Sequence, residues 1–193
     1  MTKTRLEAFS DGVIAILITI MVLELKTPHS PGWEAVKPLL PTFGSYILSF
    51  VVIAIYWGNH HHLVHTISHV NSRILWANMH LLFWLSLIPF ATGWMGETNF
   101  ARNTVATYAL LLTLCSIAYY ILLQTIAKNH PHSRELLTPL KKQSRKGLWS
   151  LLSYAAAIPL AYVHPGISGV LFVLVTVFWL VPDRDIEKTL EHN

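Results

Sequence analysis

Charged residues are scarce in this chain of 193 residues. Asp, Glu, Lys and Arg together make up 12% of it, whereas they approach about a quarter of a typical soluble domain. Hydrophobic residues account for 53%, and the mean hydropathy is +0.46. This composition excludes an ordinary soluble domain and predicts a multi-pass integral membrane protein in a lipid bilayer.

Motifs for catalysis and for covalent cross-linking are also missing. Cys115 is the one cysteine, so the chain cannot form an intrachain disulfide. Neither a glycine-rich phosphate loop nor a nucleophile elbow occurs, and the serine, histidine and aspartate residues are scattered. We therefore expect a protein that is not an enzyme and that needs no cofactor.

Six apolar stretches are long enough to span a bilayer as helices of about 17 to 25 residues. They are residues 8–25, 41–63, 74–94, 104–127, 148–163 and 166–182. The last two are short and are separated by Pro165 and Gly166, which favour a turn, so a re-entrant hairpin is the alternative there. The sequence predicts a single all-α transmembrane domain over residues 1–193 with six helices per subunit.

Lysine and arginine residues are distributed unequally between the two sides of these spans. Of the 14, Lys26, Lys37 and Arg102 fall on one side, and all the others fall on the side of the N terminus. Because cytoplasmic loops carry the excess of positive charge, both termini are expected in the cytoplasm. The most basic connector, residues 128–146, is interpreted as a topology signal that contacts lipid headgroups rather than as a nucleic-acid site.

The first apolar stretch begins with a polar cluster of Arg5, Ser10 and Asp11. Placing an aspartate where the hydrocarbon begins costs about 2.5 to 3.5 kcal/mol on insertion scales, so such a residue normally faces protein or water. The first helix is therefore expected to lie in the middle of an assembly.

This stretch resembles the prokaryotic branch of the transmembrane protein 175 family of potassium channels. The matching residues are Arg5, Phe9, Ser10, Asp11 and Gly12, followed by Ile16, Thr19, Ile20 and Leu23. The resemblance extends less sharply to Trp57 and the histidines after it and to residues 87–92, so it covers about half of the chain. It implies a passive channel in the cell membrane for potassium and other monovalent cations, formed by a homotetramer around its first helix.

Ile16, Ile20 and Leu23 follow one another at helical spacing, so they share one face of the first helix. Rings of such residues around an axis are a barrier, because a cation that passes them loses hydration without finding oxygen ligands. The resemblance implies that Ile16 forms the main constriction, that Ile20 and Leu23 form wider layers, and that Thr19 is an ion-coordinating layer. Selectivity has to arise here, because no Thr-Val-Gly-Tyr-Gly filter occurs in the sequence.

The polar cluster needs hydrogen-bond partners on neighbouring helices. The candidates in the second and third spans lie near the same membrane boundary and are Trp57, Asn59, His60, His61, His62, Asn78 and His80. We expect Arg5, Ser10 and Asp11 to join these residues in a structural polar network, with histidine or indole donors on Asp11. A proton or cation site at the pore mouth is the alternative.

Histidines support a competing hypothesis. Five of the 11 lie at residues 60–69, and His61, His62, His65 and His69 include pairs at spacings of three and four, which suit metal ligation on a helix. A histidine-dependent divalent-metal transporter is therefore the alternative function, although no carboxylate lies in this segment to complete a mixed-ligand site.

Three further alternatives remain, two of which rest on particular residues. A haem site would need opposed histidines such as His61 and His80. The acidic residues Glu24, Glu34 and Glu97 fall on the side opposite the termini, where they could attract cations to a vestibule. A structural membrane protein without transport is the last alternative.

Overall fold

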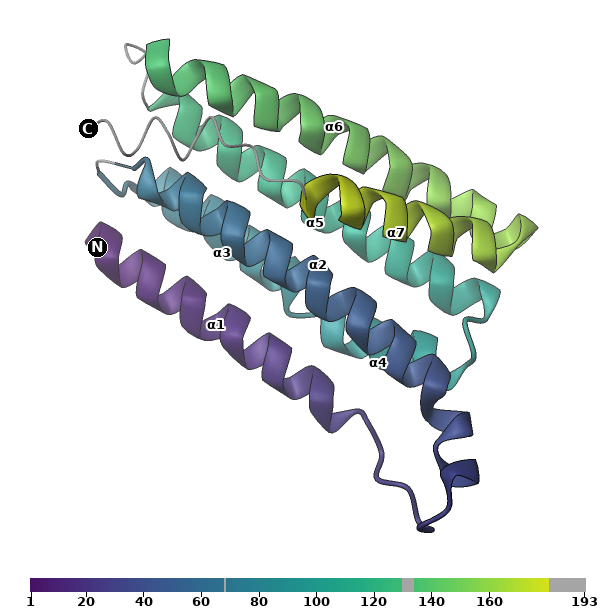
Figure 1. Ribbon diagram of the computed structural model, residues 1–193. Coiled ribbons are helices and arrows are strands. Elements are labelled where there is room, and N and C mark those ends of the chain that lie inside the picture. Colours follow the sequence, from purple (N-terminus) through teal and green to yellow (C-terminus); the bar gives the residue numbers. More distant parts are fainter. Residues whose placement is uncertain (68, 130–133, 181–193) are drawn as a thin grey trace.

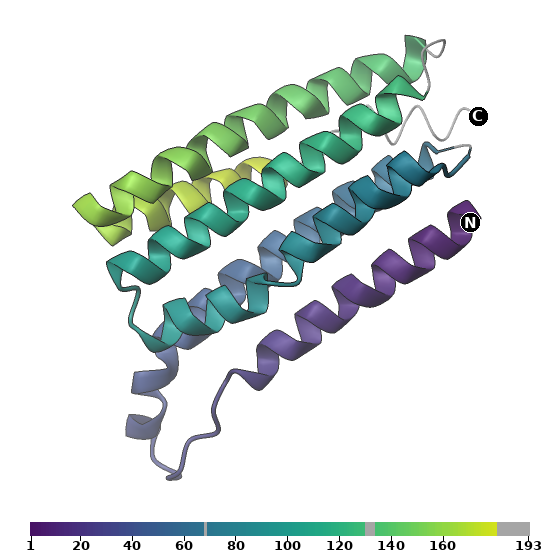
Figure 2. The same ribbon diagram turned by 180° about the vertical axis from the view of Figure 1, so that it is seen from behind.

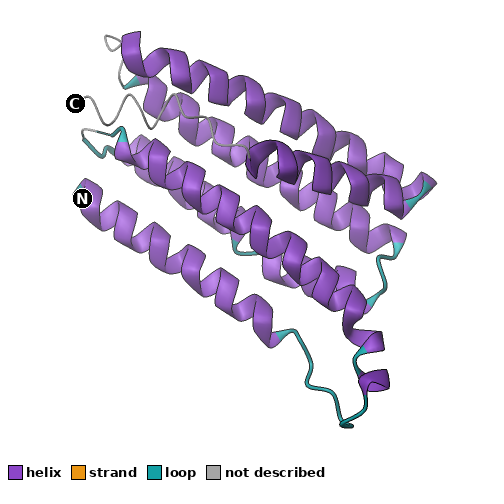
Figure 3. Cartoon of the chain, in the orientation of Figure 1, coloured by secondary structure: helices purple, strands orange, loops and turns teal. Residues whose placement is uncertain are grey.

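Helices form almost all of the chain in the computed structural model, which describes residues 1–67, 69–129 and 134–180 (Figure 1). The elements are α1 (Lys3–Leu23), the short 3-10 helices η1 (Trp33–Ala35) and η2 (Lys37–Leu39), α2 (Leu40–His65), α3 (Ser72–Leu85), α4 (Ile88–Glu97), α5 (Arg102–Lys128), α6 (Arg134–Val163) and α7 (Pro165–Leu180). Figure 3 shows only helices and loops in the part that the structure describes. The all-helical prediction is confirmed.

Four helical segments are long and apolar enough to cross a membrane. They are Lys3–Leu23, Trp33–His65, Ser72–Glu97 and Arg102–Lys128. The third is not one continuous helix, as the prediction for 74–94 implied, because Ser86 and Leu87 separate α3 from α4. Pro89 lies in the first turn of α4, where its missing amide hydrogen costs no helical hydrogen bond, and it could not continue the ladder of α3.

The C-terminal pair of helices differs more from the prediction. α6 begins at Arg134, well before the expected start at 148, and α7 has 16 residues. At a rise of about 1.5 Å per residue, α7 is about 24 Å long, whereas the hydrocarbon core is about 30 Å thick. In Figure 1, α7 accordingly runs beside only part of α5 and α6. Whether α7 crosses the membrane or forms one arm of a re-entrant hairpin stays a prediction.

The helices form a bundle with their axes roughly aligned. The N terminus, the connection between α2 and α3 and the start of α6 lie at one end, and the connections from α1 to α2, α4 to α5 and α6 to α7 lie at the other (Figures 1 and 2). Positive φ angles of 50° at Asn99 and 58° at Phe100 reverse the chain between α4 and α5. Basic side chains predicted on one side, such as Lys3, Arg73 and Lys128, belong to the first of these ends.

One glycine allows α4 to approach α2 closely. A Cβ atom added at Gly96 would lie 2.6 Å from both Ser45 Oγ and Thr42 Cα, so no larger residue fits without displacing the α2 backbone. This contact and the packing of α3 against α5 place α2, α3 and α4 in the centre of the bundle. α1 lies at its edge, where it contacts these three helices (Figures 1 and 2).

Candidate functional site

The two faces of α1 have different surroundings. The face that packs on the bundle is buried and consists of Leu6, Ser10, Ile14, Leu17 and Met21. On the opposite face, Ile16, Ile20 and Leu23 are 56%, 41% and 77% exposed. The structure therefore places all three predicted constriction residues on the uncovered face of an edge helix.

Two smaller residues share this uncovered face. The Thr19 side chain is exposed, and its hydroxyl donates a hydrogen bond to the Ile16 carbonyl oxygen at 2.9 Å. Because the hydroxyl proton is used within the helix, the lone pairs of Oγ1 remain available to an external donor or cation. Gly12, one turn before Ile16, has no atom within 4 Å of a Cβ built on it, so the face is open there.

A buried hydrogen-bond chain connects α1 to α3 and α2. Asn78 Nδ2 donates to Ser10 Oγ at 3.0 Å, and His60 Nε2 lies 2.6 Å from Asn78 Oδ1. All three side chains are at most 1% exposed. Since Asn78 Oδ1 can only accept, His60 carries its proton on Nε2 in this arrangement. The Asn78 amide therefore donates through Nδ2 and accepts through Oδ1. Ser10 Oγ in turn donates to the Leu6 carbonyl oxygen at 2.9 Å.

A second connection to α2 lies beside this chain. Trp57 Nε1 donates to Asp11 Oδ1 at 2.9 Å, and the carboxylate is half-buried. The Trp57 ring lies 6.3 Å from the His61 ring, which stacks on the His65 ring at 6.2 Å. The indole thus supplies Asp11 with a donor where hydrocarbon would otherwise surround it.

We expect the Asp11 and Trp57 pair to contribute about 1.5 kcal/mol of coupling energy to stability, because hydrogen bonds to charged acceptors contribute about 1.5 to 3 kcal/mol and this one is only half-buried. Thermal unfolding of Asp11→Ala, Trp57→Phe and the double variant measures this coupling in a double-mutant cycle. Additive effects of the two single substitutions would show that the contact contributes nothing.

Three members of the predicted polar network, Arg5, His61 and His80, make no hydrogen bond to it within the described residues, although His61 contacts Trp57 through its ring. The Arg5 side chain is exposed and makes no hydrogen bond within the part of the chain that the structure describes; only its backbone amide is bonded, to Thr2 Oγ1 at 3.4 Å. His80 Nε2 accepts a hydrogen bond from Trp84 Nε1 at 2.8 Å on the same helix. The predicted interactions of Arg5, His61 and His80 with Ser10 or Asp11 are absent among the described hydrogen bonds.

Sequence reasoning did not single out several polar residues near this site. Glu7 precedes Ser10 by three positions and has a buried Oε1 atom without a hydrogen-bond partner among the described residues. Further from α1, the Ser49 hydroxyl lies 2.9 Å from that of Tyr108 and accepts from Thr92 at 2.6 Å. The spacing of three residues between Glu7 and Ser10 could have indicated Glu7. The contacts of Ser49 with Tyr108 and Thr92 depend on how three distant segments pack.

Acidic residues at the opposite end of the bundle are mostly paired. Lys26 Nζ contacts Glu97, and this hydrogen bond and charge raise the pKa of Lys26 above its ordinary value. Lys37 forms an ion pair with Glu34 at 2.9 Å. Glu24, Lys26 and Glu97 line a surface hollow of about 380 Å³. Two of the three proposed vestibule acids therefore have a lysine as their immediate partner.

No group of three or more metal-ligating side chains occurs in the regions that the structure describes, which include His61, His62, His65 and His69. The His61 ring lies edge-on to the His62 ring, with centroids 5.8 Å apart, and stacks on the His65 ring at 6.2 Å. These are ring contacts between neighbours on one helix, without a carboxylate or cysteine among the described residues to complete a ligand set. The histidine segment therefore gives the metal-transporter alternative no preformed site.

Comparisons with known proteins agree with the resemblance in the first helix. The family model described as endosomal/lysosomal potassium channel TMEM175 matches residues 5–89. A potassium channel of Chryseobacterium sp. (strain P1-3) is 48% identical over 193 residues, which is 100% of both chains. An endosomal/lysosomal proton channel TMEM175 of Gallus gallus is 26% identical over 161 residues, which cover 76% of this chain and 32% of that protein.

A solved structure has the same fold. It is the crystal structure of a lysosomal potassium-selective channel TMEM175 homolog from Chamaesiphon minutus, which superimposes with a TM-score of 0.80. The match covers 93% of this chain and 96% of that one, at 24% sequence identity. The arrangement of α1 against the remaining helices thus belongs to a fold that is already known.

Proposed function

Since this chain belongs to the TMEM175 channel family, we propose that it is a passive potassium-permeable cation channel whose pore is lined by α1. The observation that carries the proposal is the uncovered face of α1. Ile16, Ile20 and Leu23 are exposed there, while the other face of the helix is held on the bundle by buried side chains and hydrogen bonds. The name of the 48% identical relative supports potassium as the permeant ion.

Oligomerisation would complete the pore. One subunit contributes a single edge helix, so several copies have to surround an axis, and cyclic symmetry closes such an arrangement. The family resemblance favours a homotetramer with four α1 helices at the centre. In that assembly Arg5, which is exposed on α1, would find its partner on a neighbouring subunit or in a lipid headgroup.

Four copies of Ile16 would form the narrowest ring. A hydrated cation that enters such a ring loses water ligands without receiving oxygen ligands in return, so the ring sets the conduction barrier. Ile20 and Leu23 would form wider apolar layers on the same stripe. Thr19 would offer oxygen lone pairs close to the barrier, because its hydroxyl proton is held by the Ile16 carbonyl.

The polar residues behind this face would fix its direction. The chain of Ser10, Asn78 and His60 connects three helices, and the Trp57 bond to Asp11 adds a second attachment. These contacts resist rotation of α1 about its own axis, so they keep Ile16 directed toward the symmetry axis. The end of the bundle that holds the N terminus would face the cytoplasm, in agreement with its basic side chains.

Removal of the Thr19 hydroxyl tests the coordinating layer. Valine has nearly the same shape, so Thr19→Val leaves the pore diameter unchanged and removes one oxygen ligand per subunit. We expect the permeability ratio of potassium to sodium to fall by about twofold to threefold, which corresponds to about 0.4 to 0.7 kcal/mol. Thr107→Val is the control, because Thr107 is a half-buried threonine on α5 whose hydroxyl also bonds within its helix. An unchanged ratio in Thr19→Val would remove Thr19 from the ion path.

Bi-ionic recording tests the proposed function as a whole. Purified protein in a planar bilayer, with potassium on one side and sodium on the other, should give a reversal potential of potassium-selective sign. Assembled protein that carried no current under any gradient would contradict a channel. Zinc uptake by the same protein that disappeared in the double variant His61→Ala and His65→Ala would then favour the metal transporter.

A further inference from the structure

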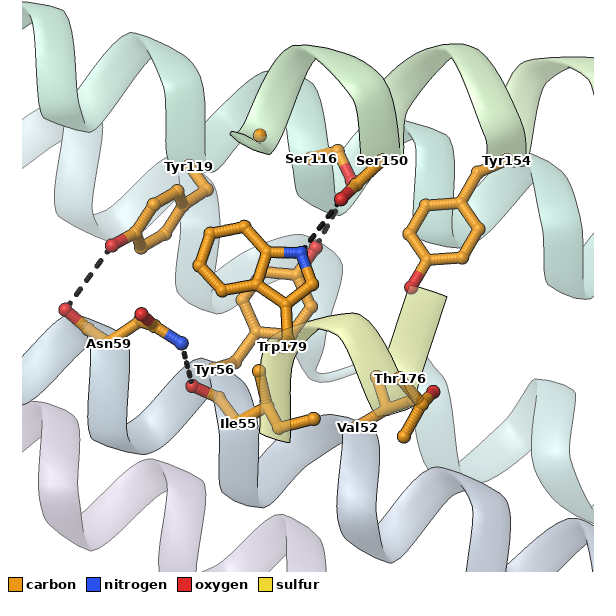
Figure 4. A pocket seen from close by; sticks show the side chains of 11 residues that line it. Val52, Ile55, Tyr56, Asn59, Ser116, Tyr119, Ser150, Tyr154, Thr176 and Trp179 are labelled. Carbon is orange, nitrogen blue, oxygen red and sulfur yellow. Dashed lines mark hydrogen bonds between the residues drawn. The ribbon is translucent and has the colours of Figure 1, made fainter. Parts of the chain in front are cut away.

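A cavity lies among four helices on the side of the bundle remote from α1. It has a volume of about 40 Å³ and is lined by residues of α2, α5, α6 and α7 (Figure 4). One water molecule needs about 10 to 15 Å³ of such volume, so the cavity has room for about three or four groups of that size. The channel mechanism described above does not use this space.

The wall of the cavity is aromatic and polar but uncharged. Three tyrosines, Tyr56, Tyr119 and Tyr154, line it together with Trp179. No charged side chain is among the lining residues that the structure describes. This wall therefore suits a neutral molecule and excludes a free ion, whose burial without a partner charge is unfavourable.

Most of the polar groups in the wall have partners within the protein. The Tyr56 hydroxyl lies 3.3 Å from Ser116 Oγ, and Trp179 Nε1 donates to Ser150 Oγ at 2.7 Å, as the dashed lines in Figure 4 show. Tyr119 donates its hydroxyl hydrogen to the carbonyl oxygen of Asn59 at 3.2 Å. These groups are fixed by protein contacts and shape the cavity.

Tyr154 is the exception. Its side chain is 5% exposed, yet its hydroxyl has no hydrogen-bond partner among the residues that the structure describes. Figure 4 shows the ring on the α6 side of the cavity with its hydroxyl directed away from its own helix and without a dashed line. The hydroxyl of a buried tyrosine is normally hydrogen-bonded, so this group, which lines the cavity, points to an occupant that can bond to it.

Gly147 leaves the same wall open. It lies in the interior of α6, where glycine is less favourable than alanine, and a Cβ built on it meets no atom within 4 Å. A side chain at this position would enter open space beside the cavity. The missing side chain and the unpartnered hydroxyl are independent features of one wall.

We propose that this cavity binds a small neutral molecule through a hydroxyl group that hydrogen-bonds to Tyr154. The occupant has about three or four non-hydrogen atoms in the cavity, and any apolar part lies against Val52 and Ile55. Water and a short-chain alcohol that partitions into the bilayer share this chemistry. Because Tyr56 and Asn59 lie close to Trp57 in α2, the occupant contacts the helix whose Trp57 donates to Asp11 of α1.

Crystals of the full chain soaked in 2-bromoethanol test this proposal, because bromine is located by its anomalous signal. We expect a bromine peak in the cavity with the alcohol oxygen within hydrogen-bond distance of Tyr154 Oη. Thermal unfolding of the detergent-solubilised protein should rise by a few degrees with millimolar 2-bromoethanol. Ordered water at Tyr154 without a bromine peak or a thermal shift would identify water as the occupant that hydrogen-bonds to Tyr154.

Three variants separate specific binding from general effects. Gly147→Leu fills the cavity mouth and should abolish the peak and the thermal shift, and Tyr154→Phe should weaken both at least fivefold in apparent affinity. Gly169→Leu is the matched control, since Gly169 is another helical glycine with open space around its Cβ and does not line the cavity. It should behave as the parent protein.

Two results would overturn the proposal. One is a cavity without bromine or ordered water in crystals of the parent protein. The other is a bromine peak of equal strength in Tyr154→Phe without any thermal shift in solution, which would mean binding at crystal concentration only. If steric overlap destabilises Gly147→Leu, Tyr154→Phe, which removes a single oxygen, keeps the test decisive.

Discussion

We expect asparagine in place of Ile16 to raise the cation current by about tenfold or more. Four amides at the proposed constriction would supply oxygen ligands and admit water where the isoleucine ring expels it. A tenfold rise requires the barrier to fall by only about 1.4 kcal/mol. The side chain is 56% exposed in the single subunit, so the substitution leaves the packing of α1 on the bundle intact. Current per unit of purified, assembled protein in planar bilayers measures the effect.

Ile117→Asn provides the matched control for this prediction. Ile117 is 37% exposed on α5, and the same chemical change there is remote from α1. The control should assemble and conduct as the parent protein does. Unchanged conductance and selectivity in a normally assembled Ile16→Asn protein would exclude Ile16 from the constriction.

Leucine in place of Asn78 should produce the largest loss of stability. The substitution keeps the number and branching of the side-chain heavy atoms but removes the polar groups that connect α1, α2 and α3, and it leaves the His60 N–H group without its acceptor. A buried polar group that loses its partner costs about 1 to 3 kcal/mol, so we expect a total of about 2 to 4 kcal/mol. Thermal unfolding and size-exclusion chromatography in detergent should show a lower midpoint and a loss of oligomer.

An exposed asparagine separates this effect from helix propensity. Asn103 lies in the first turn of α5, and its side chain makes no hydrogen bond to the described residues, so Asn103→Leu should change stability by less than about 0.5 kcal/mol. If Asn78→Leu melted at the temperature of the parent protein, the buried chain would contribute nothing to the position of α1.

The first helix was the most predictable part of the fold. A run of apolar residues of membrane length determines a helix almost by itself, and the polar residues near its start indicate which face meets protein. Ser10 is fully buried, and Asp11 has an indole donor on α2. Local sequence is informative here because the positions share one helix, whose spacing is known in advance.

Where the prediction differed from the structure, non-local packing or helix continuity decided the outcome. Hydropathy alone does not show the break between α3 and α4, because the residues on both sides of Pro89 are apolar. α6 begins early, since a helix can continue through the basic segment before residue 148 at an end of the bundle where water solvates charge. Arg5 has no partner within the described part of the subunit, because it lies on the exposed side of α1.

Polar contacts between distant helices could not be predicted either, because they too depend on non-local packing. Gln143 Nε2 donates to the Tyr119 hydroxyl at 2.7 Å and contacts Asn59 Oδ1 at 3.2 Å, so three helices meet at one buried amide. Nothing in the local sequence of any one helix indicates which of its polar residues faces the other two. The cavity beside Tyr154 likewise follows only from the assembled helices.

Cadmium block of single-cysteine variants tests the central claim most directly. The one native cysteine, Cys115, is buried and is first replaced by serine. Cadmium binds thiolates strongly, so a ring of cysteines around a narrow pore should capture it and stop the current. Ile16→Cys in this background should be blocked by micromolar cadmium and recover with a chelator, whereas Ile18→Cys, on the other side of α1, should conduct unchanged. A conducting Ile16→Cys protein that is insensitive to cadmium, or equal block of both variants, would contradict a pore lined by this face of α1.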